Sequence, residues 1–518
     1  MLMTAADYRE SLRAYKPRVF VEGERIESVA DSAILRPGIN AIGVTYDLAH
    51  VAEHAEVMTA RQHTSGKIVN RMVHVDRDSA DLLAKLEAVR LACKISGCAQ
   101  RYLTHDAFCG IFQATRLADD VHKTDYHQRF LAYMHDVQDR DLTLGVAMTD
   151  AKGDRAKRPG QQANRDAYVH IKERRKDGIV ISGAKAIVTG APYMHEFLVM
   201  PCRTHTKEDA DFAVCCAVPV DAEGVTIVAR KAGRPGEPAA KFSGKYGQST
   251  GVVLFENVFV PWERVFMAGE TEEAGYLTTS YATHHRQTCI GARAGFGDLL
   301  IGAGALMIEA NGLDPDKHGH IREQMVELIK IVEGFYACGI AASVHATRET
   351  AGNVMPDVVF SNIGKLLLAT QIYDMHRLAH TVSGGLIVTL PGPAEDHNPE
   401  TAGSLAAVLG ARADIPYASR MEAARFVEDL TVSDQAGWYS VISLHGGGSP
   451  EAMKREIWRN YPVMEKVELV EALLERGVLD DGRRVSRQPG RCCVSGCTVR
   501  DLPGVEAKPT LAVSEAAE

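Results

Sequence analysis

The chain has 518 residues, more than a single hydrophobic core usually holds, so two or three domains are expected. Its 58 lysines and arginines stand against 67 aspartates and glutamates, and this net charge of -9 offers no basic surface for nucleic acid. The N-terminus carries charges where a signal peptide needs an apolar core, and no uninterrupted apolar run reaches membrane-spanning length. We therefore expect a cytoplasmic protein that binds neither nucleic acid nor membrane.

Residues 1–143 are predicted to form an N-terminal helical domain. Ser79 is expected to cap a helix, because Leu82, Leu86 and Val89 recur after it at helical spacing. A second helical stretch follows around 127–137.

Residues 144–270 change to short runs with β character, separated by glycine and proline, and predict a middle domain built as a small β-barrel or sandwich. The polar segment 147–160 is expected to be a loop. The run 185–192 is expected to end a strand, with Thr189 and Gly190 at its edge.

Residues 271–480 return to helical periodicity and predict a C-terminal helical bundle. The segment 284–298, HHRQTCIGARAGFGD, places two histidines, an arginine and a cysteine within two helical turns, so we expect chemistry there. The glycine-rich turn HGGGSP at 445–450 suits a phosphate, because it exposes backbone N–H groups before a helix, but it equally suits a plain turn.

Eleven cysteines without a secretory signal indicate reduced thiols rather than a disulfide framework. Cys492, Cys493 and Cys497 form the motif CCVSGC, but no histidine or fourth cysteine nearby completes a tetrahedral metal site. Residues 481–518 are polar and interrupted by proline, so they are predicted to be a flexible tail.

Eight short runs, in a consistent order, resemble one protein family. They are MLMTAADYRESL, TYDLAH, GVAMTDAKGDR, GAKAIVTG, VVLFENVFVPWERVF, HHRQ, SGGLIVTLP and LHGGGSP, and they span residues 1 to about 470. The family is that of 4-hydroxyphenylacetate 3-monooxygenase and 4-hydroxybutyryl-CoA dehydratase, and the dehydratase branch is the more similar. The resemblance implies an α+β multidomain fold of the acyl-CoA-dehydrogenase type, with FAD between its domains, in a homotetramer or homodimer.

The resemblance places FAD against three segments. They are the loop with Thr149, Asp150, Gly153 and Arg155, the strand edge at Thr189 and Gly190, and the turn of Ser383, Gly384, Gly385 and Leu386 from the same or a neighbouring subunit. Backbone donors and a hydroxyl near the flavin ring tune its electronics, and an arginine offsets phosphate charge. Each residue alone could also belong to an ordinary turn.

In the dehydratase branch, three cysteines and one histidine hold a 4Fe-4S cluster. By motif, Cys98 and His285 match two of these positions, whereas Tyr102 and Ala292 stand at the other two. A tyrosine and an alanine do not replace two thiolates on a cubane cluster, so we predict neither this cluster nor another metal.

A displaced cluster is an alternative, and it would use Cys93, Cys98, His285 and Cys289. Cys93 and Cys98 are five residues apart on a helix and so diverge. Other polar positions of the dehydratase branch, where the family has acids, a tyrosine and a lysine, are here Thr250, Cys289, Arg293 and Ile442. Ile442 cannot do acid–base work, which argues against the dehydratase reaction.

The monooxygenase branch is also incomplete. Its phenol-recognising arginine, tyrosine and histidine fall near Arg101, Ala107 and Val146, so only the arginine is kept. Phenol hydroxylation needs a group that deprotonates or orients the hydroxyl. The substrate is therefore not expected to be a simple 4-hydroxyphenyl acid.

The prediction is an FAD-dependent monooxygenase or related oxidoreductase acting on a small organic substrate. A separate flavin reductase is expected to supply reduced flavin, because no GxGxxG unit follows a strand. His285, Arg286, Arg101 and Tyr102 are the predicted catalytic residues, and Gln100, Arg101, Tyr102 and Cys289 are the predicted substrate contacts. His285 could also be an ordinary hydrogen-bonded core histidine.

The alternative function is a flavin-dependent dehydratase or isomerase acting on a hydroxyacyl- or enoyl-CoA-type substrate, with His285 as its base. It requires a second base across the flavin, where Thr250 and Ile442 offer none. A flavoprotein without catalytic activity is a third possibility, and the retained set of FAD-facing residues argues against it.

Overall fold

The computed structural model describes residues 2–474, which form two compact units divided between Pro450 and Glu451. Helix α13 (Pro450–Asn460) begins at this division, and α14 (Val463–Leu473) lies in the second unit. Every feature described below belongs to the first unit. The predicted flexible tail and its three cysteines lie outside the described residues.

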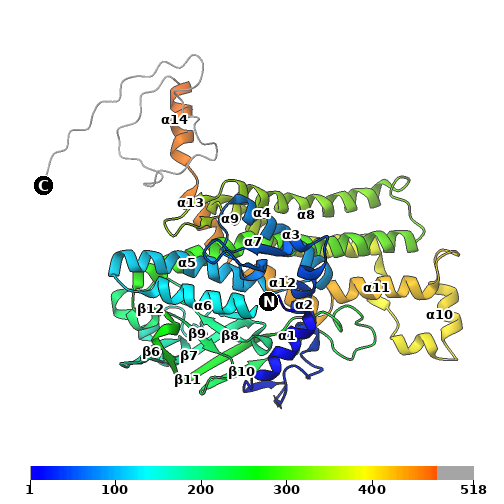
Figure 1. The fold of residues 1–518 in the computed structure, drawn as a ribbon. Helices are drawn as coiled ribbons and strands as arrows, with labels where there is room; N and C mark the ends of the chain where they lie inside the picture. Colours follow the sequence, from blue (N-terminus) through cyan, green and yellow to red (C-terminus); the bar gives the residue numbers. More distant parts are fainter. Residues whose placement is uncertain (1, 475–518) are drawn as a thin grey trace. The chain divides into compact units, whose positions relative to one another are not determined.

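The N-terminal part of the chain is mainly helical, and two small hairpins interrupt it (Figure 1). Its α-helices are α1 (Ala5–Ser11), α2 (Arg36–Asp47), α3 (Ala55–Met58), α4 (Ser79–Ser96), α5 (Tyr102–His122) and α6 (Tyr126–Arg140). Its strands are β1 (Val19–Val21), β2 (Glu24–Ile26), β3 (Thr59–Arg61) and β4 (Ile68–Asn70). The N-cap of α4 is Asp78 rather than the predicted Ser79, because the Asp78 carboxylate accepts the N–H groups of Ala80 and Asp81.

The middle of the chain contributes eight strands. They are β5 (Leu144–Ala147), β6 (His170–Arg174), β7 (Gly178–Thr189), β8 (Glu196–Val199), β9 (Val214–Pro219), β10 (Val225–Ala229), β11 (Thr250–Pro261) and β12 (Val265–Ala268). One sheet has the order β2-β1-β10-β11-β7-β6, and the other has the order β12-β9-β8-β5. These are two open sheets, so of the predicted β-barrel or sandwich the described residues do not form the barrel, and the apolar side chains between the sheets form one continuous core.

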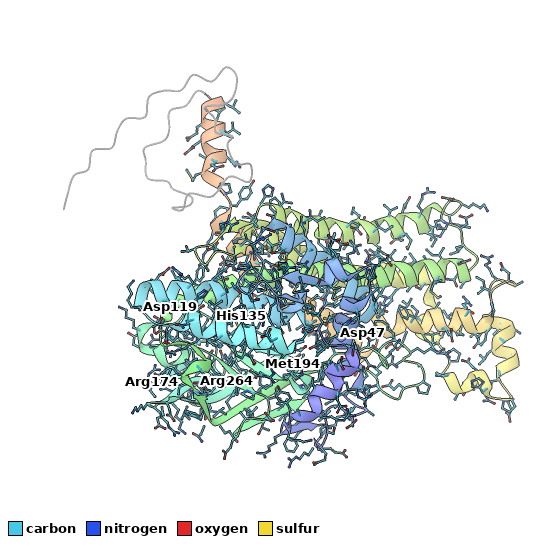
Figure 2. All side chains as sticks on the ribbon, in the orientation of Figure 1. Asp47, Asp119, His135, Arg174, Met194 and Arg264 are labelled. Atoms are coloured by element: carbon cyan, nitrogen blue, oxygen red, sulfur yellow. The ribbon has the colours of Figure 1, made fainter. Side chains whose placement is uncertain are left out.

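A partly buried ion pair helps to attach the smaller sheet to the N-terminal helices. Arg264, labelled in Figure 2, donates to the Glu196 carboxylate on β8 at 2.6 Å. The hydroxyl of Tyr133 on α6 donates to the same carboxylate at 2.9 Å. The sheet and α6 therefore share one anchoring group.

The C-terminal part is a helical bundle. Its helices within the first unit are α7 (Thr271–Ala310), α8 (Gly319–Val344), α9 (Val358–Ser383), α10 (Ala402–Leu409), α11 (Tyr417–Thr431) and α12 (Asp434–His445), and the strands β13 (Thr347–Arg348) and β14 (Val354–Met355) pair between α8 and α9. Helix α9 ends at Ser383, and the short 3-10 turn Gly385–Thr389 follows it.

Helix α7 is the centre of the bundle, and it packs against α4, α5, α8, α9 and α11 (Figure 1). Gly291 and Gly295 allow a close approach to α4, since an added Cβ would lie 2.6 Å from the Leu86 carbonyl oxygen and 2.5 Å from that of Arg90. By length and composition α7 could cross a membrane, but 61% of its most apolar window is buried inside the structure, as is usual for a core helix.

The structure changes from helices to strands after Arg140 and back to helices at Thr271. These changes fall close to the predicted boundaries at 143/144 and 270/271. The division into separate domains stays a prediction, because one compact unit contains all three regions as far as Pro450.

Candidate active site

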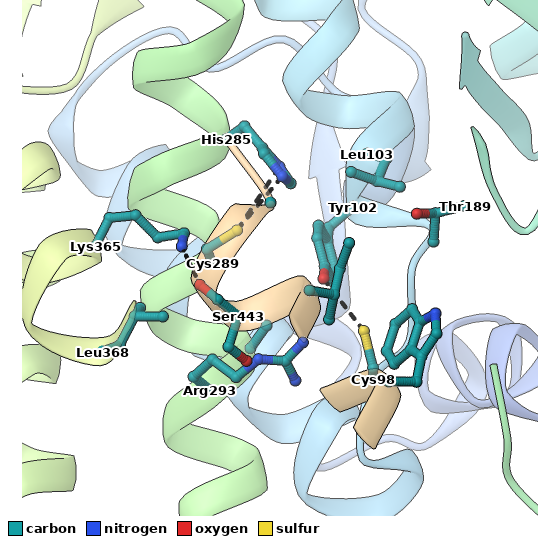
Figure 3. A pocket seen from close by; sticks show the side chains of 14 residues that line it. Cys98, Tyr102, Leu103, Thr189, His285, Cys289, Arg293, Lys365, Leu368 and Ser443 are labelled. Carbon is teal, nitrogen blue, oxygen red and sulfur yellow. Dashed lines mark hydrogen bonds between the residues drawn. The ribbon is translucent and has the colours of Figure 1, made fainter. Parts of the chain in front are cut away.

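A cavity of about 40 Å³ lies where α5, α7, α9 and α12 meet the end of β7 (Figure 3). Its lining includes Cys98, Tyr102, Thr189, His285, Cys289, Ala292, Arg293, Lys365, Trp438, Ile442 and Ser443. Eight of these residues stood out in the sequence for their position in the family motifs: Cys98, Tyr102, Thr189, His285, Cys289, Ala292, Arg293 and Ile442. Segments nearly 350 residues apart in the chain thus contribute to one small site.

Helical spacing explains which α7 residues reach the cavity. His285, Cys289 and Arg293 are separated by four residues each, so they lie on one face of the helix. Arg286 is rotated by about 100° from His285 and faces elsewhere. Its Nε donates to the Gly447 carbonyl oxygen and its Nη1 to Asn362 Oδ1, both at 2.9 Å. Arg286 therefore joins α7 to the 445–450 turn and to α9, and it does not line the cavity.

His285 lies between a carboxylate and a thiol. Its Nδ1 is 2.9 Å from Asp106 Oδ2, and its Nε2 is 3.4 Å from Cys289 Sγ. Because a carboxylate only accepts, Nδ1 carries a proton and Nε2 faces the sulfur. The Thr288 hydroxyl donates to the other Asp106 oxygen at 2.6 Å, and the Tyr281 ring stacks on the imidazole with a centroid distance of 5.4 Å. The imidazole is thus held in one orientation.

This arrangement favours a charged pair of imidazolium and thiolate. Burial by itself lowers the pKa of His285, but the Cys289 sulfur and the Asp106 carboxylate outweigh it and raise that pKa to about 10. Burial raises the pKa of Cys289, but the His285 charge outweighs it, so the net shift of this thiol pKa is downward. A proton can therefore be held either by His285 Nε2 or by Cys289 Sγ, which lie 3.4 Å apart.

More buried charges lie behind Asp106. Lys85 Nζ is 3.3 Å from Asp76 Oδ2 and 4.0 Å from Asp106 Oδ1, and His105 Nε2 is 3.0 Å from Asp76 Oδ1. Asp76, His105 and Cys109 are the only group of three possible metal ligands within 4.8 Å of one another among the described residues. The Lys85 ammonium already supplies a positive charge to this cluster, which therefore acts as a support for Asp106.

The positions of the cluster ligands have a different chemistry here. The Tyr102 hydroxyl lies 3.3 Å from Cys98 Sγ, and Ala292 adds only a methyl group to the wall. A hydrogen bond from the Cys93 thiol, outweighing burial, lowers the pKa of Cys98 to about 6. Cys93 itself accepts the Ala99 N–H at 3.4 Å and does not line the cavity. Of the four groups of the displaced cluster, Cys98, His285 and Cys289 line the cavity and Cys93 does not.

Two cations also line the cavity. Arg293 is 5% exposed, and its Nη1 has no hydrogen-bond partner. Lys365 is fully buried and donates to the Ser443 carbonyl oxygen at 2.5 Å. Burial lowers the pKa of Lys365 to about 8, so the Lys365 ammonium can lose its proton close to physiological pH.

Gln100 and Gly190 lie outside the cavity lining, next to Thr189 at the end of β7, and their chemistry suits a flat heteroaromatic group such as a flavin. Gln100 has a φ of 52°, is 1% exposed, and its Nε2 lacks a hydrogen-bond partner. A Cβ on Gly190 would lie 2.0 Å from Met194 Cε and 3.0 Å from Gln100 Oε1, so only glycine fits there. Thr189 lines the cavity beside it. The free amide donor of Gln100, the hydroxyl of Thr189 and the backbone at Gly190, which no side chain covers, suit a ring that carries carbonyl acceptors.

The other residues predicted to contact the cofactor lie outside the cavity. Asp150 accepts from Lys185 Nζ at 2.7 Å in a buried ion pair, so its carboxylate holds the loop to β7. Thr149 is half-buried next to it, and Gly153 and Arg155 are exposed. Ser383, Gly384, Gly385 and Leu386 lie at the end of α9, about 25 Å along the helix from Lys365. Their contact with a cofactor stays a prediction.

Arg101, predicted to be catalytic, does not line the cavity. Its Nη2 donates to Asp141 Oδ1 at 2.5 Å, and its guanidinium carbon lies 3.8 Å from the centroid of the Tyr46 ring. Arg101 and Asp141 are fully buried. This arginine is built into the core between α2, α5 and the start of β5.

Two residues of the site were missed from the sequence: Asp106, which orients His285, and Lys365. Each is a single charge within an apolar helical stretch, LTHDAFC and IGKLLLA, and such a charge usually has a buried partner. An isolated charge of this kind can be recognised in the sequence. Its partner cannot, because the partner depends on how distant helices pack.

Fold and site together define an enzyme of the acyl-CoA-dehydrogenase-like α+β class, which confirms the predicted fold class. Residues 4–267 match the family described as 4-hydroxyphenylacetate 3-hydroxylase N terminal, and residues 274–475 match its C terminal counterpart. The chain belongs to this 4-hydroxyphenylacetate 3-hydroxylase family, as the resemblance predicted.

Two similar proteins support the dehydratase branch. The 4-hydroxybutyryl-CoA dehydratase/vinylacetyl-CoA-Delta-isomerase of Clostridium aminobutyricum is 36% identical over 91% of this chain and 99% of its own. The oxygen-tolerant archaeal 4-hydroxybutyryl-CoA dehydratase of N. maritimus is 33% identical, with a TM-score of 0.88 over 92% of this chain and 96% of that chain.

A third comparison concerns the monooxygenase branch. The oxygenase component of 4-hydroxyphenylacetate 3-monooxygenase, solved as a complex with FAD, is 22% identical, with a TM-score of 0.81 over 91% of this chain and 98% of that chain. At this identity the likeness shows the fold alone. The branch closer to this chain is thus the dehydratase branch, as predicted.

Proposed function

We propose that this protein is an FAD-dependent isomerase or lyase that moves a proton along the acyl chain of a thioester substrate. The observation that carries the proposal is the Asp106–His285–Cys289 line at the cavity wall. It provides a proton acceptor and a proton donor 3.4 Å apart, with a carboxylate that fixes the imidazole. The names of the dehydratase/isomerase relatives support a thioester substrate.

In this proposal the Cys289 thiolate takes a proton from the carbon next to the thioester carbonyl. His285, as imidazolium, gives a proton back at the far end of the resulting allylic anion, and the double bond moves into conjugation. Bound FAD supplies reversible electron transfer, and Gln100, Thr189 and Gly190 would hold its ring. The apolar side chains of Trp438 and Ile442 keep water from the carbanion.

Dehydration through an iron–sulfur cluster is not part of the proposal. Tyr102 and Ala292 stand at two of the four ligand positions, and neither supplies a thiolate. A double-bond shift needs only positioned acid and base groups, and these are present. The predicted monooxygenase reaction has less support, because Arg101 is committed to Asp141 and Ala107 has no polar group.

The test uses the full chain loaded with FAD and a but-3-enoyl-CoA substrate in deuterated water. We expect a conjugated thioester with deuterium at the terminal carbon, followed by ultraviolet absorbance and mass spectrometry. Cys289→Ala and His285→Gln should each lower the rate by about 10²- to 10⁴-fold. Cys338→Ala is the matched control, because this half-buried thiol on α8 bonds only to the Gly334 carbonyl at 3.7 Å.

The absence of isomerisation by FAD-saturated wild-type protein would refute the proposal. Oxygen consumption with an added flavin reductase would instead favour the monooxygenase. The separate reductase, the homotetramer or homodimer and the cytoplasmic location all stay predictions.

A further inference from the structure

Arg293 and Lys365 share the cavity without a carboxylate to balance their charges. No aspartate or glutamate lines the cavity, and neither cation forms an ion pair with a carboxylate among the described residues. Arg293 Nη1 also has no hydrogen-bond partner, although the side chain is 95% buried. A buried, unpaired guanidinium or ammonium is costly, so such a pair indicates a missing anion.

The thiols of the cavity do not supply enough negative charge. Cys289 faces the His285 imidazole and is balanced by it. Burial raises the pKa of the Tyr102 hydroxyl well above its usual value, so the phenol stays neutral. The two cations therefore face sulfur atoms but no carboxylate in the cavity lining.

The geometry points to a carboxylate-binding site: we propose that Arg293 and Lys365 together bind a carboxylate group carried by the acyl substrate. In Figure 3, Ser443 lies between the two cationic side chains, on the side of the cavity opposite Thr189. The volume of about 40 Å³ holds about three water-sized atoms, which matches the three heavy atoms of a carboxylate. A guanidinium with a free N–H and an ammonium are the usual partners of such a group.

This inference deepens and rests on the proposed function, because it names a chemical class of substrate for it: the thioester of a short acyl chain that also bears a carboxylate. A neutral hydroxyl or phenol would leave both cations unpaired. A carboxylate would pair with them and would also hold the chain beside Cys289.

The test measures the binding of propionate to the FAD-loaded full chain by calorimetry at constant ionic strength. Propionamide, which has nearly the same shape and no charge, is the ligand control. We expect propionate to bind and propionamide not to bind detectably, and Arg293→Gln and Lys365→Gln each to weaken propionate binding on the order of tenfold or more. Arg377→Gln is the matched variant control, because it removes an exposed arginine of α9.

Arg293→Lys keeps the charge, so it should bind propionate more tightly than Arg293→Gln does. If Arg293→Gln does not fold, the comparison of Lys365→Gln with wild type decides the question. Equal affinity for propionate and propionamide, or binding unaffected by both substitutions, would overturn the inference. Tighter binding of inorganic phosphate than of propionate would also overturn it.

The binding assay and the isomerase assay fail independently. Turnover of but-3-enoyl-CoA without propionate binding would remove the carboxylate site and leave the proposed function standing. Propionate binding without isomerisation would support the site and refute the proposed function. Where both succeed, a thioester with an added carboxylate should show a lower KM than but-3-enoyl-CoA, and Arg293→Gln should abolish that difference.

Discussion

Replacement of Arg101 by methionine should destabilise the protein rather than weaken its substrate binding. The substitution leaves the Asp141 carboxylate buried without its 2.5 Å ion-pair partner, and it removes the guanidinium that lies 3.8 Å from the Tyr46 ring centroid. Loss of one partner of a buried ion pair costs about 3–5 kcal/mol. An unfolding entropy of about 2.1 cal/mol/K per residue makes each kcal/mol worth roughly 1 °C in a unit of this size. We therefore expect Tm to fall by about 3–5 °C.

Thermal unfolding of the full chain at neutral pH measures this effect. The double variant with Asp141→Asn should lose less than the sum of the two single variants, because the pair is then removed as a whole. Arg116→Met is the matched control, since this arginine forms an exposed pair with Asp120 on the same helix α5, and its Tm should not change. An unchanged Tm together with a raised KM in Arg101→Met would refute the reasoning and restore the substrate role predicted from the sequence.

Three further predictions concern the cavity and its surroundings. His285→Ala should abolish turnover while FAD stays bound, and unchanged turnover would remove this histidine from the mechanism. Asp106→Asn should move the alkaline limb of the pH–rate profile to lower pH, because this carboxylate helps to raise the pKa of His285 to about 10. The imidazolium is present below this folded pKa and is lost as the pH rises through it, so an unmoved limb would contradict the assignment. Gly97→Ala should lower the free energy of unfolding by at least ~1 kcal/mol, because Gly97 has a φ of 71° and an added Cβ would lie 2.3 Å from Tyr439 Oη; Gly302→Ala in an open position of α7 should be neutral or stabilising in the same denaturant titration.

The order of helices, strands and helices could be predicted from the sequence because it depends on local periodicity. The same holds for the face of α7, since the spacing of His285, Cys289 and Arg293 places them together in any helix. Helical rotation alone also places Arg286 on a different face from these three residues. Its inclusion among the predicted catalytic residues did not take this rotation into account. The closure of the strands could not be predicted, because the pairing of distant strands decides between a barrel and two sheets.

The partners of the central histidine could not be predicted in this way. Asp106 is 179 residues from His285, and their 2.9 Å contact exists only because α5 packs against α7. Arg101 shows the opposite case, a residue named for its position in a motif whose guanidinium the fold directs to Asp141. A motif identifies the elements that build a site, whereas the direction of each side chain depends on tertiary packing.

The replaced cluster positions form one consistent set. Tyr102 places a hydroxyl 3.3 Å from the remaining thiol, Cys98, and Ala292 leaves space beside it. Arg293 adds a permanent positive charge to the same wall, and that charge helps to lower the pKa of Cys98. The Arg293 charge also disfavours a further cation beside the Cys98 thiolate, because the two positive charges would repel each other. The cavity therefore has a positive pole that is built from side chains. A positive pole of this kind attracts and orients an anionic group, and it leaves the proton transfers to Cys289 and His285.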